Sequence, residues 1–239
     1  MFYRKPIESL AETIGSPYGI LLILLLATLA LYPFLGYFPV LLWGLNLVTL
    51  AMVAAALQLT HRKGLIYYLT LVLGLSTFLA DVSSHVLEIE ADYPVAAALR
   101  ALFMALLIVA FFIDIMRRKK VTIDAVLGAC CILILLALAF GSTFILIEWV
   151  APGSFYFPNE VTSSQATHLR SSIEFELNYF SLVTLTTIGY GDIYPLSPPA
   201  RSLATLEGLL AQLYLAIIIA RLVGMEISGR LLESKVHEK

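Results

Sequence analysis

Long apolar runs separated by short polar connections are the feature that most limits the fold of this chain. A hydrocarbon core of about 30 Å takes roughly 20 helical residues. Six runs approach or exceed this length: Tyr18–Leu31, Val40–Leu59, Leu65–Ala80, Val95–Met116, Val121–Val150 and Ser202–Val223. They predict an all-α membrane protein with six transmembrane helices.

The composition agrees with a protein that is surrounded by lipid. Of the 239 residues, 60% are hydrophobic and only 13% are charged, and the mean hydropathy is +0.90. A soluble domain usually has about 25% charged residues. The net charge of −2 gives no reason to expect a nucleic-acid partner. No Ser/His/Asp, Cys/His or phosphate-loop arrangement is present, so we do not expect an enzyme.

The basic residues predict how the helices are oriented. Most of the 15 lysines and arginines lie at alternate ends of the apolar runs: Arg4, Lys5, Arg62, Lys63, the run 117–120, Arg221, Arg230, Lys235 and Lys239. Short loops rich in lysine and arginine are usually cytoplasmic. We therefore expect a multi-pass protein of the plasma (inner) membrane with both termini in the cytoplasm.

The connection between the fifth and sixth runs has an unusual form. The polar stretch Ala151–Ser172 is followed by Ile173–Ile188, which is too short and too rich in threonine to cross a bilayer. A half-length helix followed by glycines is typical of a re-entrant loop. We expect a pore helix over Phe175–Thr186, with Glu174 and Glu176 near its N-terminus, where the helix dipole favours negative charge.

A short motif follows this half-length helix. Residues 186–192 read Thr-Thr-Ile-Gly-Tyr-Gly-Asp, which resembles the filter signature of potassium channels, with Ile188 where valine is commonest. Gly189 and Gly191 permit backbone conformations that other residues adopt only with strain, so successive carbonyls can point at one axis. The resemblance covers about residues 121–227 and implies an outer helix, a pore helix, a filter and an inner helix.

The resemblance also implies specific roles for individual residues. The filter would consist of Thr187, Ile188, Gly189, Tyr190 and Gly191. Potassium ions would bind to the backbone carbonyls of Thr187, Ile188, Gly189 and Tyr190. Thr186 would support the filter, and Asp192 would lie at its outer mouth. Because one loop cannot enclose a pore, a homotetramer is expected.

The rest of the chain completes the predicted organisation. Residues 1–120 would form a four-helix membrane region, 121–227 the pore domain and 228–239 a short cytoplasmic tail. The fourth run contains only Arg100 where a voltage sensor needs several arginines. We expect a tetrameric, passive, potassium-selective channel without strong voltage gating, which needs no cofactor and has K⁺ as its permeant ion. A non-conducting or regulatory subunit and a K⁺ transporter-related protein are the alternatives.

Three features of the last run bear on gating. Gln212, Leu215, Ile219 and Val223 share one helical stripe, and the resemblance implies that this stripe faces the pore. Gln212 would then line the cavity and the three apolar residues would form a gate, although ordinary helix packing is an alternative. Ala211 stands where many family members have a hinge glycine. Glu207, a carboxylate within an apolar run, should be either partnered or protonated.

Two further groups of side chains are interpreted as structural. His85, Glu88, Glu90 and Asp92 could hold a divalent cation, but they lack tight ligand spacing, so a solvated acidic connection is favoured. Cys130 and Cys131 lie inside an apolar run. We expect them to pack in the core rather than form a disulfide or a metal site.

Overall fold

The computed structural model describes residues 15–31, 40–59, 64–85, 93–118, 122–158 and 166–237. Its elements in chain order are α2 (Pro17–Leu31), α3 (Val40–Leu59), α4 (Leu65–His85), α5 (Tyr93–Arg117), α6 (Ile123–Val150), β1 (Phe155–Tyr156), α7 (Ala166–Leu185), β2 (Tyr194–Pro195) and α8 (Pro198–His237). Every predicted apolar run coincides with a helix. The half-length helix is α7.

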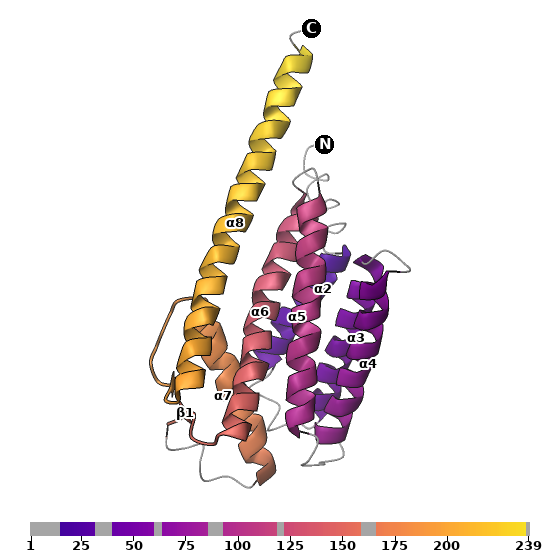
Figure 1. The fold of residues 1–239 in the computed structure, drawn as a ribbon. Helices are drawn as coiled ribbons and strands as arrows, with labels where there is room; N and C mark the ends of the chain where they lie inside the picture. The colour runs from indigo at the N-terminus through magenta and orange to yellow at the C-terminus, as the bar shows by residue number, and fades with distance from the viewer. Residues whose placement is uncertain are drawn as a thin grey trace, which may run out of the picture.

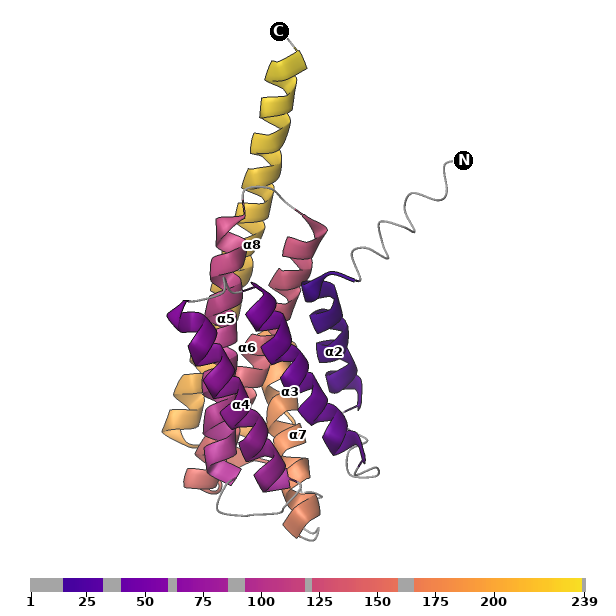
Figure 2. The ribbon, with the colours of Figure 1, turned by 90° about the vertical axis from the view of Figure 1, so that its right-hand side faces the viewer.

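The helices pack into an elongated bundle around α5 and α6. Helix α5 lies along α6, α4 covers α5, and α2 contacts both α6 and α3. Helices α7 and α8 pack on the other side of α6 and against each other. Helix α8 continues well beyond the other helices (Figure 1). When the molecule is turned by 90°, α2, α3 and α4 form the face toward the viewer (Figure 2).

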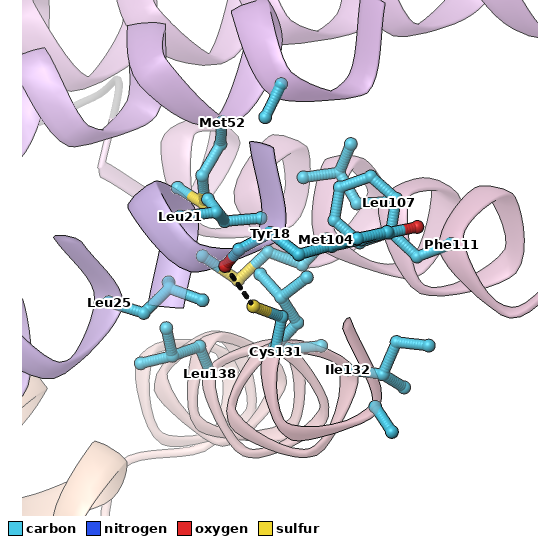
Figure 3. Packing of buried hydrophobic residues seen from close by; sticks show 14 of the residues in the cluster. Tyr18, Leu21, Leu25, Met52, Met104, Leu107, Phe111, Cys131, Ile132 and Leu138 are labelled. Atoms are coloured by element: carbon cyan, nitrogen blue, oxygen red, sulfur yellow. Dashed lines mark hydrogen bonds between the residues drawn. The ribbon is translucent and has the colours of Figure 1, made fainter. Parts of the chain in front are cut away.

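The main hydrophobic core joins α2, α3, α5 and α6. Tyr18 is fully buried there, and its ring meets Phe111 edge-on with the ring centroids 5.3 Å apart. Figure 3 shows the Cys131 thiol next to the Tyr18 backbone, where it donates a hydrogen bond to the Tyr18 carbonyl at 3.5 Å. Cys131 therefore packs in the core as predicted. The prediction is wrong for Cys130, which is exposed because it lies on the outer side of α6.

Polar caps explain where three of the helices begin. The Ser16 and Thr122 side chains accept hydrogen bonds from the third residue beyond them, at the starts of α2 and α6. Ser197 takes the same position before α8, and its hydroxyl accepts from the Ala200 amide at 3.4 Å. Pro198 then occupies the first helical position, where its missing N–H costs nothing. Such caps satisfy amides that have no partner within the helix.

Three helices in the described ranges are long and apolar enough to cross a membrane. They are Tyr93–Arg117, Ile123–Val150 and the first 28 residues of α8, Pro198–Met225. Helix α2 has 15 residues, which at 1.5 Å per residue extend about 22 Å, less than the hydrocarbon thickness. The structure thus supports an all-α membrane protein, and six spans stay a prediction.

Two helices are longer than hydropathy predicts. Helix α7 begins at Ala166 rather than Phe175, and it ends at Leu185, one residue before Thr186. Helix α8 begins at Pro198 and continues to His237. The extra residues are mostly polar, so they carry no hydropathy signal, and none of those beyond Pro199 is a proline.

Close packing between α6 and α7 depends on Gly141. A β-carbon at this position would lie 2.2 Å from Asn178 Oδ1 and 3.1 Å from Asn178 Cα. We expect Gly141→Ala to lower the free energy of unfolding in detergent by about 1–3 kcal/mol, because α7 must shift away. Gly44→Ala is the matched control, since a β-carbon on this α3 glycine meets nothing within 4 Å. Equal thermal stability of the two variants would contradict the prediction.

Candidate functional site

A two-stranded β-ladder joins the two ends of the segment that contains α7. Strands β1 and β2 pair antiparallel, with Phe155 opposite Pro195 and Tyr156 opposite Tyr194. The Glu148 carboxylate, at the end of α6, accepts hydrogen bonds from the Gly153 amide at 2.7 Å and the Phe155 amide at 3.0 Å. The chain therefore leaves α6 and returns to α8 at one fixed place.

Between these strands, α7 extends along only part of the bundle (Figure 1). The loop after α7 turns back toward the end of the bundle where α8 begins, as Figure 1 also shows. Residues 186–192 lie in this loop. The fold thus places the motif at the outer side of the bundle, beside α7 and α8 (Figure 1).

A defined hydrogen-bond pattern ends α7 and begins the motif. The Ile188 amide donates to the Val183 carbonyl at 3.0 Å, and the Thr187 amide donates to the Thr184 carbonyl at 3.1 Å. Together with a left-handed Thr187, at φ 62°, these two bonds form a Schellman motif. Glycine usually takes this left-handed position, so threonine there is strained by about 1–2 kcal/mol. The sequence gives no signal for this feature.

The backbone alternates in handedness along the motif. Thr187, Gly189 and Gly191 have positive φ angles of 62°, 60° and 78°, whereas Ile188 and Tyr190 between them do not. A β-carbon on either glycine would meet nothing within 4 Å in the single chain. The requirement for glycine is therefore conformational and not steric. Backbone of this kind lets successive carbonyls point toward one side of the chain.

A hydrogen bond joins the end of the motif to α7. The Tyr179 hydroxyl donates to Asp192 Oδ2 at 2.8 Å, and the Ile193 amide donates to Asp192 Oδ1 at 3.0 Å. Desolvation and the bond to Asp192 raise the pKa of Tyr179 to about 12, so its hydroxyl stays a donor at neutral pH. Burial also raises the pKa of Glu176, and the charge of Asp192 raises it further.

The remaining side chains of the motif point to different surroundings. The Thr186 hydroxyl donates back into α7, to the Leu182 carbonyl at 2.6 Å. The Tyr190 ring stacks parallel to Tyr179 with centroids 6.5 Å apart, although the residue is 70% exposed. Ile188 is 54% exposed. In the single chain, both residues thus leave a large apolar surface uncovered.

An ion-pair network connects α7 to the helices that precede it. Arg100 on α5 lies 2.6 Å from Glu174 Oε1 on α7 and 3.3 Å from Asp81 Oδ1 on α4. Glu174 is the ninth residue of α7, so the prediction that it lies near the helix N-terminus is wrong. The same correction applies to Glu176. The Glu174 carboxylate is placed by Arg100 and not by the helix dipole.

A second polar contact joins α7 to α6 and α8. The Ser181 oxygen lies 2.6 Å from the Ala137 carbonyl of α6, and it also forms a hydrogen bond with Glu207 Oε1 of α8. One turn further along α7, Leu185 belongs to a small buried cluster with Ala137 and Ala211. The partner of Glu207 is therefore Ser181, a residue that the sequence analysis did not identify.

The predicted gate residues lie away from the face that α8 buries. Glu207, Ala211 and Ile218 form the buried side of the helix. Gln212, Ile219 and Val223 are exposed, and Leu215 is half-buried. Ala211, at the predicted hinge position, is fully buried against α6 and α7. The predicted stripe is thus free to face other chains, a cavity or lipid.

Nothing in the described part of the chain resembles a metal centre built from side chains. Within residues 15–31, 40–59, 64–85, 93–118, 122–158 and 166–237 there is no group of three or more His, Cys, Asp or Glu residues that could hold an ion. Glu88, Glu90 and Asp92 lie outside the described residues, as does the side chain of His85.

Comparison with known proteins identifies the region around the motif. Residues 132–226 match a family model described as an ion channel. The match includes most of α6, all of α7, the motif and much of α8. No curated protein matches the chain, and no solved structure matches it. The family match and the apolar helices together indicate an integral membrane protein with an ion-channel domain.

The Arg100 network should contribute more to stability than a similar but more exposed arginine. Arg100→Gln leaves Asp81 and Glu174 without their cation, which for a mostly buried pair costs about 3 kcal/mol. Arg118→Gln is the matched control, because Arg118 also joins two carboxylates, Asp114 and Asp124, with all three side chains at least 25% exposed. It should cost about 1 kcal/mol. Chemical unfolding in detergent measures both, and equal losses would refute the ranking.

Proposed function

We propose that four copies of this chain form a potassium-selective channel through which K⁺ passes downhill. The carbonyls of Thr187, Ile188, Gly189 and Tyr190 would replace the hydration shell of the ion, and the Thr187 hydroxyl would close the innermost site. Gly191 would complete the filter, with Thr186 supporting it and Asp192 at the outer mouth. No catalytic step and no cofactor is involved.

The alternating backbone of residues 187–191 carries this proposal. Positive φ angles at Thr187, Gly189 and Gly191 are separated by single residues of ordinary handedness. A tight turn needs only one or two left-handed residues in succession. Three left-handed residues at alternate positions instead suit a row of carbonyls along an axis. This pattern lies within the region that matches the ion-channel family model.

The surface of α8 supports assembly of several chains. Leu209, Leu213 and Ile217 are about half exposed, as are Ile219 and Val223 of the predicted gate. Together they cover most of the α8 surface that lies outside its buried side. One face can therefore contact a neighbouring chain while another lines a central cavity, where Gln212 would be a polar residue and Leu215, Ile219 and Val223 an apolar gate.

The arrangement of Arg100 supports a channel without strong voltage gating. Within α5, Arg100 and Arg117 are the basic residues, whereas a sensor needs an arginine series. Arg100 is held by acidic residues from α4 and α7. We therefore propose that the first four helices do not move strongly with voltage. We also propose that the protein lies in the plasma (inner) membrane with both termini on its cytoplasmic side.

The exchange of one glycine tests the filter directly. In liposomes with a potassium gradient, we expect K⁺ flux with little Na⁺ flux, and block by Ba²⁺. Gly189→Ala should reduce the K⁺/Na⁺ flux ratio by about tenfold or more, because alanine at φ 60° is strained by about 1–2 kcal/mol in every subunit. Gly153→Ala is the matched control, since Gly153 has φ 83° but lies outside the motif.

Unchanged selectivity in Gly189→Ala would overturn the filter assignment. Absence of flux from the unmodified protein, at several voltages and pH values, would instead favour a non-conducting or regulatory subunit. A flux that depends on a second substrate would favour a transporter-related protein.

The assembly is tested separately from conduction. Native mass spectrometry in detergent should give four times the 26.3 kDa mass of one chain. A single-loop chain cannot surround an axis by itself, so a monomer would contradict the proposed channel. Assembly only in the presence of another channel chain would support the regulatory alternative.

A further inference from the structure

Glu207 on α8 is a fully buried acidic side chain. It is 0% exposed, and Ser181 on α7 is also 0% exposed. The two side chains meet where α6, α7 and α8 come together. A carboxyl group removed from water in this way must be either neutral or paired with a cation.

Hydrogen counting decides which group supplies each proton. A serine hydroxyl has one proton to donate and two lone pairs that accept. The Ser181 oxygen lies 2.6 Å from the Ala137 carbonyl, which can only accept, so the hydroxyl proton belongs in that bond. The second contact of Ser181, with Glu207 Oε1, then needs a proton from the carboxyl group.

In the described part of the chain, no lysine or arginine forms an ion pair with the Glu207 carboxyl group. Arg100 is held by Asp81 and Glu174, and Arg201 is exposed and donates to the Pro195 carbonyl at 3.1 Å. Arg221 donates to backbone carbonyls of residues 115, 116 and 118 at the end of α5.

The second oxygen of the Glu207 carboxyl group supports the same assignment. Among the described residues, Glu207 Oε2 has no hydrogen-bond partner. In an ionised carboxylate this oxygen would carry part of a buried charge without compensation, which is costly. In a neutral acid it is only a carbonyl oxygen, and the unmade bond costs much less.

We infer that Glu207 is a neutral acid that donates its proton to Ser181, which in turn donates to Ala137. This hydrogen-bond chain joins α8, α7 and α6, and it fixes the depth and rotation of α7 one turn before Leu185. Glu207 is thus a positioning residue for the motif that α7 carries. Its influence on ion selection rests on the proposed function, but its protonation and its bond to Ser181 do not.

Infrared spectroscopy of the full-length protein in lipid tests the protonation without any flux measurement. At neutral pH, the C=O stretching band of a protonated carboxylic acid should be present, and Glu207→Gln should remove it. Glu174→Gln is the matched control, because Glu174 is also buried but pairs with Arg100 and should be ionised. A band that survives Glu207→Gln, or that disappears in Glu174→Gln instead, would overturn the assignment.

Four variants test the positioning role. Glu207→Gln keeps a donor, so it should retain the stability and K⁺/Na⁺ flux ratio of the unmodified protein to within about twofold. Glu207→Leu and Ser181→Ala should each lower the ratio of folded to unfolded protein at equilibrium by about tenfold, because a buried polar group loses its hydrogen-bond partner. Ser142→Ala is the matched control, because this buried hydroxyl donates at 2.9 Å to Leu138 within its own helix.

The outcomes separate this inference from the proposed function. If Glu207→Gln is as harmful as Glu207→Leu, the residue acts as a charged carboxylate and the inference is wrong. Equal losses in Ser181→Ala and Ser142→Ala would remove the link between helices. If the unmodified protein conducts no K⁺ but the infrared and stability results are as expected, the proposed function fails while the hydrogen-bond chain stands.

Discussion

The position of α7 is the constraint on which the rest of this structure depends. The backbone of residues 187–191 adopts conformations that local sequence does not favour at Thr187, so a rigid support must hold it. One stripe of α7 provides that support. Glu174 meets Arg100, Asn178 packs against Gly141, and Ser181 contacts both Ala137 and Glu207. Because these residues recur every three or four positions, they lie on one face of α7, and that face makes these contacts to the bundle.

The helices were largely predictable because burial in lipid or protein needs long apolar runs, and six of the runs became helices at nearly the expected places. Failures occurred where hydropathy carries no information. Helix α7 starts at Ala166 among polar residues, and α8 continues through a charged segment to His237. Hydropathy also does not settle how many helices cross the membrane, because the 15 described residues of α2 are fewer than the roughly 20 that a span needs.

The motif could be located from sequence, but its supports could not. The glycines at 189 and 191 indicate a left-handed backbone, and the structure has this conformation at both positions. At Thr187 the same conformation arises from hydrogen bonds to Val183 and Thr184, which override the preference of threonine. The partners of α7 are equally hidden in the sequence. Glu174 lies 74 residues from Arg100 in the sequence, and Ser181 lies 26 residues from Glu207. These residues meet only because the helices pack together.

Contacts toward both ends of α5 join it to the region that matches the ion-channel family model. At one end, Arg100 connects α5 to α7 through Glu174. At the other, the Arg221 guanidinium of α8 donates to the Arg118 carbonyl at 3.0 Å and to two carbonyls in the last turn of α5. These carbonyls lie at or just after the C-terminal end of α5, where the helix dipole is negative, so the cation suits them. A displacement of α5 would have to break both contacts. Arg100 and Arg221 thus tie α5 to α7 and to α8.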